Sequence, residues 1–228
     1  MDEVITKHKE NVKKIMERYK KETEEFLKLA DEVYEAEYSF RKNIAKMLSP
    51  ESYQKGLDTY LSEYERISEI LKQKEIDYKK LFDDSNANNI EFSVSIQTNV
   101  NNNAYSKDEV KTNIEKLTEE FDDEYAKMIK DYNDAINSVI EKINKEVKAN
   151  RKFVIEYGGF TFTPDETIEN AYKPIYDKHD EVDDKFIFDF QTRALVINWI
   201  PENIKNEYSL IIKKLDDNYD VFKDIFGE

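Results

Sequence analysis

The chain has 228 residues, of which 39% are hydrophobic and 37% are charged, with only four Gly, four Pro and no Cys. The lack of cysteine excludes disulfides, zinc–thiolate sites and thiol nucleophiles. The formal net charge is −15, from 50 acidic and 35 basic residues. Such a charge argues against direct binding to nucleic-acid backbones or anionic membranes, and it would speed encounter with a basic partner.

Residues 3–48 are predicted to form one long helix, because mostly apolar residues recur there in alternating steps of three and four. A heptad pattern of this length is typical of a coiled coil or a long helical bundle. A second apolar row widens the stripe and favours a three-helix arrangement over a two-stranded zipper. The positions on the strict spacing are Ile5, His8, Val12, Ile15, Tyr19, Glu22, Phe26, Leu29, Val33, Ala36, Phe40, Asn43 and Met47.

A second helix is predicted over 50–82, after a break at Ser49-Pro50. Ser suits the N-cap and Pro suits the first helical position. This helix can fold back on the first as a hairpin, or it can continue the first as a kinked rod. The hairpin is favoured, because one continuous rod would leave both broad apolar stripes without partners.

The segment from 83 to 105 is predicted to contain a polar loop, a strand and a turn. Residues 83–89 are rich in Asn and Asp, which is typical of a loop. Residues 90–100 alternate between apolar and polar side chains with a period of two, as a half-buried strand does. Residues 99–103 form a short Asn-rich turn before the next helix.

The longest uninterrupted helical pattern runs from Ser106 to Asn150 and predicts a central helix. Its first four residues, Ser106 to Glu109, form a capping box in which the Ser and Glu side chains each satisfy a backbone N–H. Apolar residues then recur in helical steps, and no Gly or Pro interrupts them. A helix of this length would be about 67 Å long.

Beyond residue 150 the period changes, and a small β module is predicted. Residues 152–163 alternate around Gly158-Gly159, which indicates a hairpin or a glycine-containing bulge in one bent strand. Residues 186–190 and 195–199 alternate in the same way and are predicted to pair. The strand at 90–100 would join this sheet, because a lone strand is not stable in water.

Two helices and an acidic loop complete the chain. A second capping box at Thr163–Glu166 starts a short helix that ends near Tyr176. Residues 177–184 are predicted to form an acidic loop, and Pro201 to open the last helix.

The predicted fold is mainly α: a long antiparallel helical bundle or coiled-coil hairpin with a small antiparallel β-sheet module, in the α+β class. The predicted segments are the helical hairpin (1–82), the strand and Asn-rich loop that join the sheet (83–105), the central helix packed on the hairpin (106–150), the β module with its short helix (151–200) and the C-terminal helix (201–228).

Two acidic clusters are the candidate partner-binding residues, although an ordinary solvated helix face has the same pattern. Neither His8 nor His179 has metal-ligand spacing, and the loop at 177–184 lacks the spacing and central Gly of an EF-hand. We therefore assign no catalytic, cofactor-binding or metal-binding residue. The clusters are Glu119, Glu120, Asp122, Asp123 and Glu124 in the central helix, and Asp177, Asp180, Glu181, Asp183 and Asp184 in the loop.

These features predict a non-enzymatic acidic binding protein that sequesters or inhibits a macromolecular partner, such as an immunity or phage anti-defence protein. The expected partner is a protein, with a basic one favoured, and no direct nucleic-acid binding is expected. One alternative is a coiled-coil scaffold that self-associates into a homo-oligomer. Another is a metal-binding protein or enzyme that uses the acidic loop at 177–184.

A cytoplasmic location is expected, because no apolar run approaches the roughly 20 residues of a membrane span. The first residues also do not resemble a signal peptide. The alternative is an exported or lipid-anchored protein.

Overall fold

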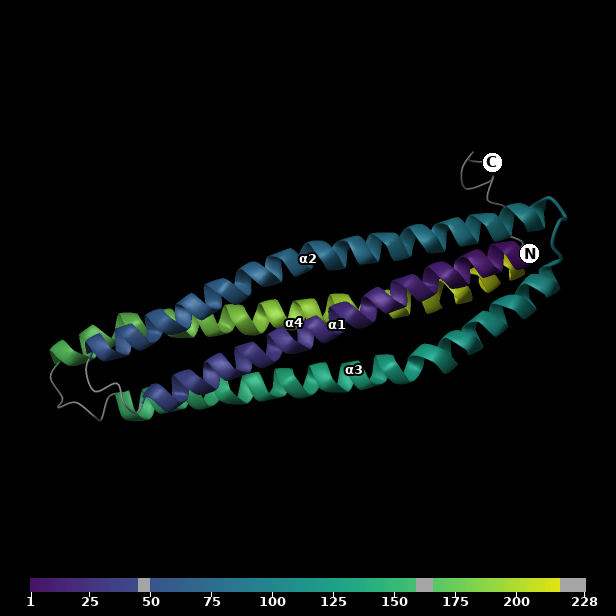
Figure 1. The fold of residues 1–228 in the computed structure, drawn as a ribbon. Helices are drawn as coiled ribbons and strands as arrows, with labels where there is room; N and C mark the ends of the chain where they lie inside the picture. Colours follow the sequence, from purple (N-terminus) through teal and green to yellow (C-terminus); the bar gives the residue numbers. More distant parts are fainter. Residues whose placement is uncertain (45–49, 159–165, 218–228) are drawn as a thin grey trace. The chain divides into compact units, whose positions relative to one another are not determined.

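The computed structural model describes residues 1–44, 50–158 and 166–217, and these residues form four long α-helices (Figure 1). The helices are α1 (Asp2–Ile44), α2 (Pro50–Asn101), α3 (Lys107–Gly158) and α4 (Glu166–Asp216). The described residues contain no β-strand. The predicted helical bundle is therefore confirmed, and the predicted β-sheet module is wrong.

The helices pack as two compact units, and every helix contributes one segment to each unit. The first unit comprises Met1–Thr23, Asp77–Asn133 and the chain from Val196 onward. The second unit comprises Glu24–Ile76 and Asp134–Leu195. Each unit consequently has a core built from all four helices.

In the first unit, side-chain contacts show the directions of the helices. Rising residue numbers on α1 meet falling numbers on α2, and α3 and α4 are related in the same way, so both pairs are antiparallel. Buried side chains from all four helices, among them Tyr19, Tyr78, Leu117 and Tyr208, form the core. The contacts are Lys7–Glu91 and Arg18–Asp84 between α1 and α2, and Lys107–Leu215 and Asp122–Lys205 between α3 and α4.

In the second unit, α1 and α2 are again antiparallel. Glu25 pairs with Lys74, and Glu32 lies 2.6 Å from Arg66. Phe26 of α1 packs on Phe190 of α4, with ring centroids 5.5 Å apart. The core of this unit also contains Leu29, Val33, Leu57, Ile67, Leu71, Val139, Ile143, Val147 and Val182.

The apolar stripe predicted on the first helix is the inward face of α1 in both units. Of the twelve positions on the strict spacing that the structure describes, nine are buried, so the three-four spacing identifies most core residues correctly. They are Ile5, His8, Val12, Ile15, Tyr19, Phe26, Leu29, Val33 and Phe40.

The helix starts agree with the capping signals. α2 begins at Pro50, and α3 begins at Lys107 with the Glu109 N–H donating to Ser106 Oγ at 3.2 Å. Asn103, between α2 and α3, has a φ of 56°, in the left-handed region that Asn tolerates better than most residues. This conformation ends α2 and lets the chain reverse into α3.

The loop and strand predicted between 83 and 100 are wrong, because α2 continues to Asn101. Residues four apart share one side of a helix, so the alternating segment divides into two faces. Phe92 and Ile96 are buried, whereas Ile90 and Val94 are exposed on the opposite face. A period of two over a few residues therefore also fits a helix with apolar side chains on two sides.

The remaining parts of the predicted β module are also wrong. Residues 152–158 belong to α3, and the predicted hairpin residues 159–163 lie outside the described residues. The segment 177–200 is helical, so the acidic loop and both strands there are parts of α4. Pro201 does not open a helix but lies inside α4, where its missing N–H removes one backbone hydrogen bond.

Two alanine substitutions distinguish the helix from the predicted strand. Phe92→Ala should lower the free energy of unfolding by about 3–5 kcal/mol, because it empties a buried site. Ile90→Ala should lower it by less than about 1 kcal/mol, because Ile90 is 62% exposed. Urea unfolding followed by circular dichroism measures both values. In a strand the two residues would share a face, so similar losses would contradict the helical assignment.

Candidate functional site

The acidic residues predicted as a partner-binding cluster on the central helix lie on α3 in the first unit. Glu120 pairs with Lys9 of α1 at 2.5 Å, and Asp122 pairs with Lys205 of α4 at 2.7 Å. These two carboxylates therefore join α3 to its neighbours. The other three, Glu119, Asp123 and Glu124, are exposed.

The second acidic cluster lies on α4 in the second unit. Asp177, Glu181 and Asp184 are exposed, and Asp180 is half-buried. Asp183 is fully buried, so it is a core residue rather than part of a surface patch. The two clusters belong to different units, and their contact with a partner remains a prediction.

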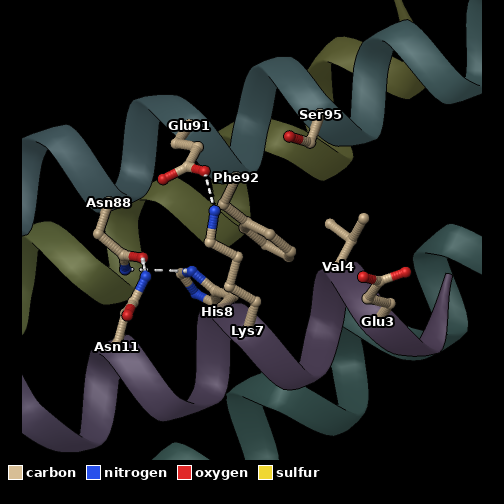
Figure 2. A pocket seen from close by; sticks show the side chains of 9 residues that line it. All are labelled: Glu3, Val4, Lys7, His8, Asn11, Asn88, Glu91, Phe92 and Ser95. Carbon is tan, nitrogen blue, oxygen red and sulfur yellow. Dashed lines mark hydrogen bonds and ion pairs between the residues drawn. The ribbon is translucent and has the colours of Figure 1, made fainter.

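A buried polar network in the first unit is centred on His8 of α1 (Figure 2). Asn88 of α2 donates from Nδ2 to His8 Nδ1 at 3.1 Å, and Asn11 Nδ2 donates to the side-chain oxygen Oδ1 of Asn88 at 3.1 Å. His8 Nε2 lies 3.0 Å from the hydroxyl of Tyr208 on α4. Because Nδ1 accepts a hydrogen bond, the neutral ring carries its proton on Nε2 and donates it to Tyr208.

This environment favours the neutral form of His8. The ring is 2% exposed and stacks on Phe92, with centroids 3.8 Å apart and planes inclined by 11°. Burial lowers the pKa of His8 from 6.5 to about 4.

The pocket beside this network is small. It has a volume of about 170 Å³ and lies between α1 and α2, with Lys7, Glu91 and Ser95 around His8 and Phe92 (Figure 2). Ligand pockets usually have volumes of about 300–1,000 Å³. The His8 network is therefore a structural contact between helices rather than a ligand site.

A second buried polar network lies in the second unit and takes one residue from each helix. Tyr60 of α2 donates its hydroxyl toward Glu37 of α1 and lies 2.7 Å from Asp183 of α4. Asn150 of α3 donates to the Glu37 carboxylate at 2.7 Å and to the Glu37 backbone carbonyl at 3.1 Å. All four side chains are buried, and this burial, followed by the two carboxylates, raises the pKa of Tyr60 well above 10.

This network was not predicted from the sequence, although the spacing of Glu37 and Asn150 places both at core positions. Glu37 lies four residues after Val33 and three before Phe40, both of which are buried. Asn150 lies three residues after the buried Val147. Polar residues at core spacing are the expected signature of such networks. Asp183 could not be found in this way, because it lies in the segment predicted as a loop.

The exposed large hydrophobic side chains are distributed unevenly among the helices. In the part of the chain that the structure describes, all eight lie on α2 or α4, and none lies on α1 or α3. Five of them come from the segments that were predicted as strands. They are Ile70, Ile76, Ile90 and Val94 on α2, and Phe188, Leu195, Trp199 and Leu210 on α4.

Comparisons of the chain with protein-family models, curated proteins and solved structures found no significant match. Within residues 1–44, 50–158 and 166–217, no three His, Asp or Glu side chains are grouped so that they could hold a metal ion. None of the described helices has a stretch long and apolar enough to cross a membrane.

The lowered pKa of His8 predicts an acid-sensitive contribution to stability. The unfolded chain binds a proton at His8 below pH 6.5, but the folded protein does so only near pH 4. Between these values protons favour unfolding, so the stability linked to His8 is present above pH 6.5 and is lost as the pH falls toward 4. The total loss is about 3 kcal/mol.

Urea unfolding of the wild type and of His8→Gln at pH 7 and pH 4 measures this contribution. The glutamine variant is less stable at pH 7 but lacks the titrating ring, so its stability should fall by about 3 kcal/mol less than that of the wild type. Equal losses in the two proteins would show that His8 is not the neutral, buried group described above.

Proposed function

We propose that the protein is a non-enzymatic binding protein that sequesters or inhibits a protein partner whose contacting surface is basic. The supporting observation is the confinement of all eight exposed large hydrophobic side chains of the described residues to α2 and α4. Scattered exposed apolar residues need no explanation, but a contiguous group of them is typical of an interaction site.

The first unit carries four of these side chains, which we call the first-unit apolar surface: Ile90, Val94, Trp199 and Leu210. Ile90 and Val94 are four residues apart, and Trp199 and Leu210 are eleven apart, close to one and three helical turns. Each pair therefore lies along one side of its helix. Both pairs face away from the core, because all four side chains are at least 42% exposed.

The two helices that carry this surface are neighbours in the first unit. The side-chain amide of Asn203 on α4 donates to the side-chain oxygen of Asn86 on α2, and Asn89 of α2 donates to the backbone carbonyl of Asn203 at 3.2 Å. The partners of these contacts are 117 and 114 residues apart in sequence. The same offset along α2 and α4, which run parallel here, places Leu210 level with Val94 and Trp199 level with residue 83. The α4 row therefore overlaps the α2 row at its Leu210 end and extends beyond it toward Trp199.

The negative charge of the protein favours a basic partner. With a net charge of −15, the chain attracts basic proteins and repels acidic ones, including a second copy of itself. Exposed carboxylates such as Glu119, Asp123 and Glu124 add to this field in the first unit. In this proposal the carboxylates steer the partner, and the apolar side chains hold it.

Capture from a lysate of the source cell, followed by titration of the purified partner, tests the proposal. The double variant Trp199→Ser/Val94→Ser removes two apolar contacts, and Ile70→Ser, in the second unit, is the control for loss of an exposed apolar residue. The wild type and the control should bind the same basic protein and release it as salt rises, because salt screens exposed ion pairs. The double variant should bind it about 30-fold more weakly or worse, as expected for a tryptophan hot spot.

Two results would contradict this function. Unchanged affinity of the double variant would show that the first-unit apolar surface does not hold the partner. A wild-type mass that rises with concentration in light scattering, and that the double variant abolishes, would assign the surface to self-association and would favour the scaffold instead.

A further inference from the structure

A hollow in the second unit lies between α1 and α2. It has a volume of about 780 Å³, within the usual range for sites that bind small organic molecules. Its lining comes from the C-terminal part of α1, between Lys28 and Asn43, and from the N-terminal part of α2, between Ser52 and Arg66. It shares no residue with the first-unit apolar surface, because every lining residue belongs to the second unit.

The hollow exists because small side chains face each other across the two helices. Ala36 and Ser39 of α1 and Ser52, Gly56 and Thr59 of α2 occupy positions where longer side chains would fill the space. Among these residues, Gly56 contributes most clearly to the hollow. Glycine destabilises the interior of a helix relative to alanine, and here it leaves the wall of the hollow without a side chain.

Two aromatic rings from the core form the apolar floor. Phe40 and Tyr60 each line the hollow although they are only 4% exposed, and their ring centroids are 5.2 Å apart. The hydroxyl of Tyr60 is hydrogen-bonded to Glu37 and Asp183. The hydroxyl therefore belongs to the buried network, and the ring is the part of Tyr60 that a bound molecule would meet.

The charged rim has an excess of negative charge. Four carboxylates and three cationic side chains line the hollow, which gives it a formal charge of −1. Arg66 is shared by Glu32, at 2.6 Å, and Glu63, at 3.1 Å, so one cation serves two carboxylates. Asp31 and Glu35 on α1 are exposed at the edge of the hollow.

We propose that this hollow binds a small organic cation with an apolar body, such as an aromatic or alkyl amine. The apolar body would cover the rings of Phe40 and Tyr60, where its burial is favourable. The ammonium group would lie near Glu35 and Asp31, and aromatic rings also attract cations over their faces. The charge of −15 on the whole chain raises the local concentration of such a ligand and disfavours an anionic one.

Three fluorescent probes that share one apolar group and differ in charge test this site: dansylcadaverine, which is cationic, dansylamide, which is neutral, and dansylglycine, which is anionic. Each probe is titrated into the full chain, and the dissociation constant is taken from the rise in dansyl fluorescence. The cation should bind tightest and the anion weakest, with about a threefold to fivefold difference between the cation and the neutral probe, as expected for exposed ion pairs.

Two variants and one control assign the binding to the hollow. Gly56→Leu places a side chain in the hollow and should weaken the binding of all three probes at least about tenfold. Leucine has a higher helix propensity than glycine, so the variant should stay folded. Glu35→Gln should remove most of the preference for the cation and leave the neutral probe unchanged. Ala87→Leu, at an exposed position of α2 in the first unit, should change none of the three constants.

The proposal is overturned if no probe shows saturable binding, or if Gly56→Leu binds the cation as tightly as the wild type does. It is also overturned if the anionic probe binds tightest, because the charge assignment would then be wrong. Thermal melting of Gly56→Leu confirms that any loss of binding comes from filling the hollow. The proposal does not depend on the protein partner, since Trp199→Ser/Val94→Ser should leave all three constants unchanged.

Discussion

Each helix of a four-helix bundle can bury only one stripe of side chains, and the surface of this protein follows from that constraint. Among the described residues, no large hydrophobic side chain of α1 or α3 is exposed. In contrast, α2 and α4 carry exposed hydrophobic side chains on their outer faces, in addition to those in the core. Val94 and Trp199 are two of these exposed side chains. They add nothing to the core of their unit, and this excess is the reason for proposing that the outer faces of α2 and α4 contact a partner.

Polar side chains inside the units connect helices that apolar packing alone would leave free to slide. His8 joins α1 to α2 and α4 in the first unit, and Tyr60 joins α2 to α1 and α4 in the second. Burying such groups is costly unless they are hydrogen-bonded, so a shift of one helix along another would leave them unsatisfied. These networks favour a single register of the helices. In the second unit, the small residues around Gly56 leave a hollow between α1 and α2.

The helical part of the fold could be predicted because a long run of apolar residues in steps of three and four fits only a helix. The stripe on α1 and the cap at Ser106 were both read correctly. The β module was predicted because residues 90–100 and 186–199 carry apolar side chains on two faces of a helix, which over a few residues cannot be distinguished from strand alternation. The Asn-rich segment was predicted as a loop because Asn and Asp are common in loops. Its place in a helix depends on contacts that form only in the folded protein, such as the hydrogen bond from Asn88 to His8. The hollow beside Gly56 depends on which helices meet, and the spacing within one helix does not contain that information.

The most direct test of this account is the solvent accessibility of Trp199, the single tryptophan of the chain. Acrylamide quenching of its fluorescence in the purified protein reports whether the outer face of α4 is uncovered. We expect a red-shifted emission that acrylamide quenches readily, to the same extent at every protein concentration tested, because Trp199 is 51% exposed. A blue-shifted tryptophan emission that acrylamide does not quench would mean that Trp199 is buried in a core or in a dimer, and it would contradict the proposal that the outer face of α4 is uncovered in the first unit.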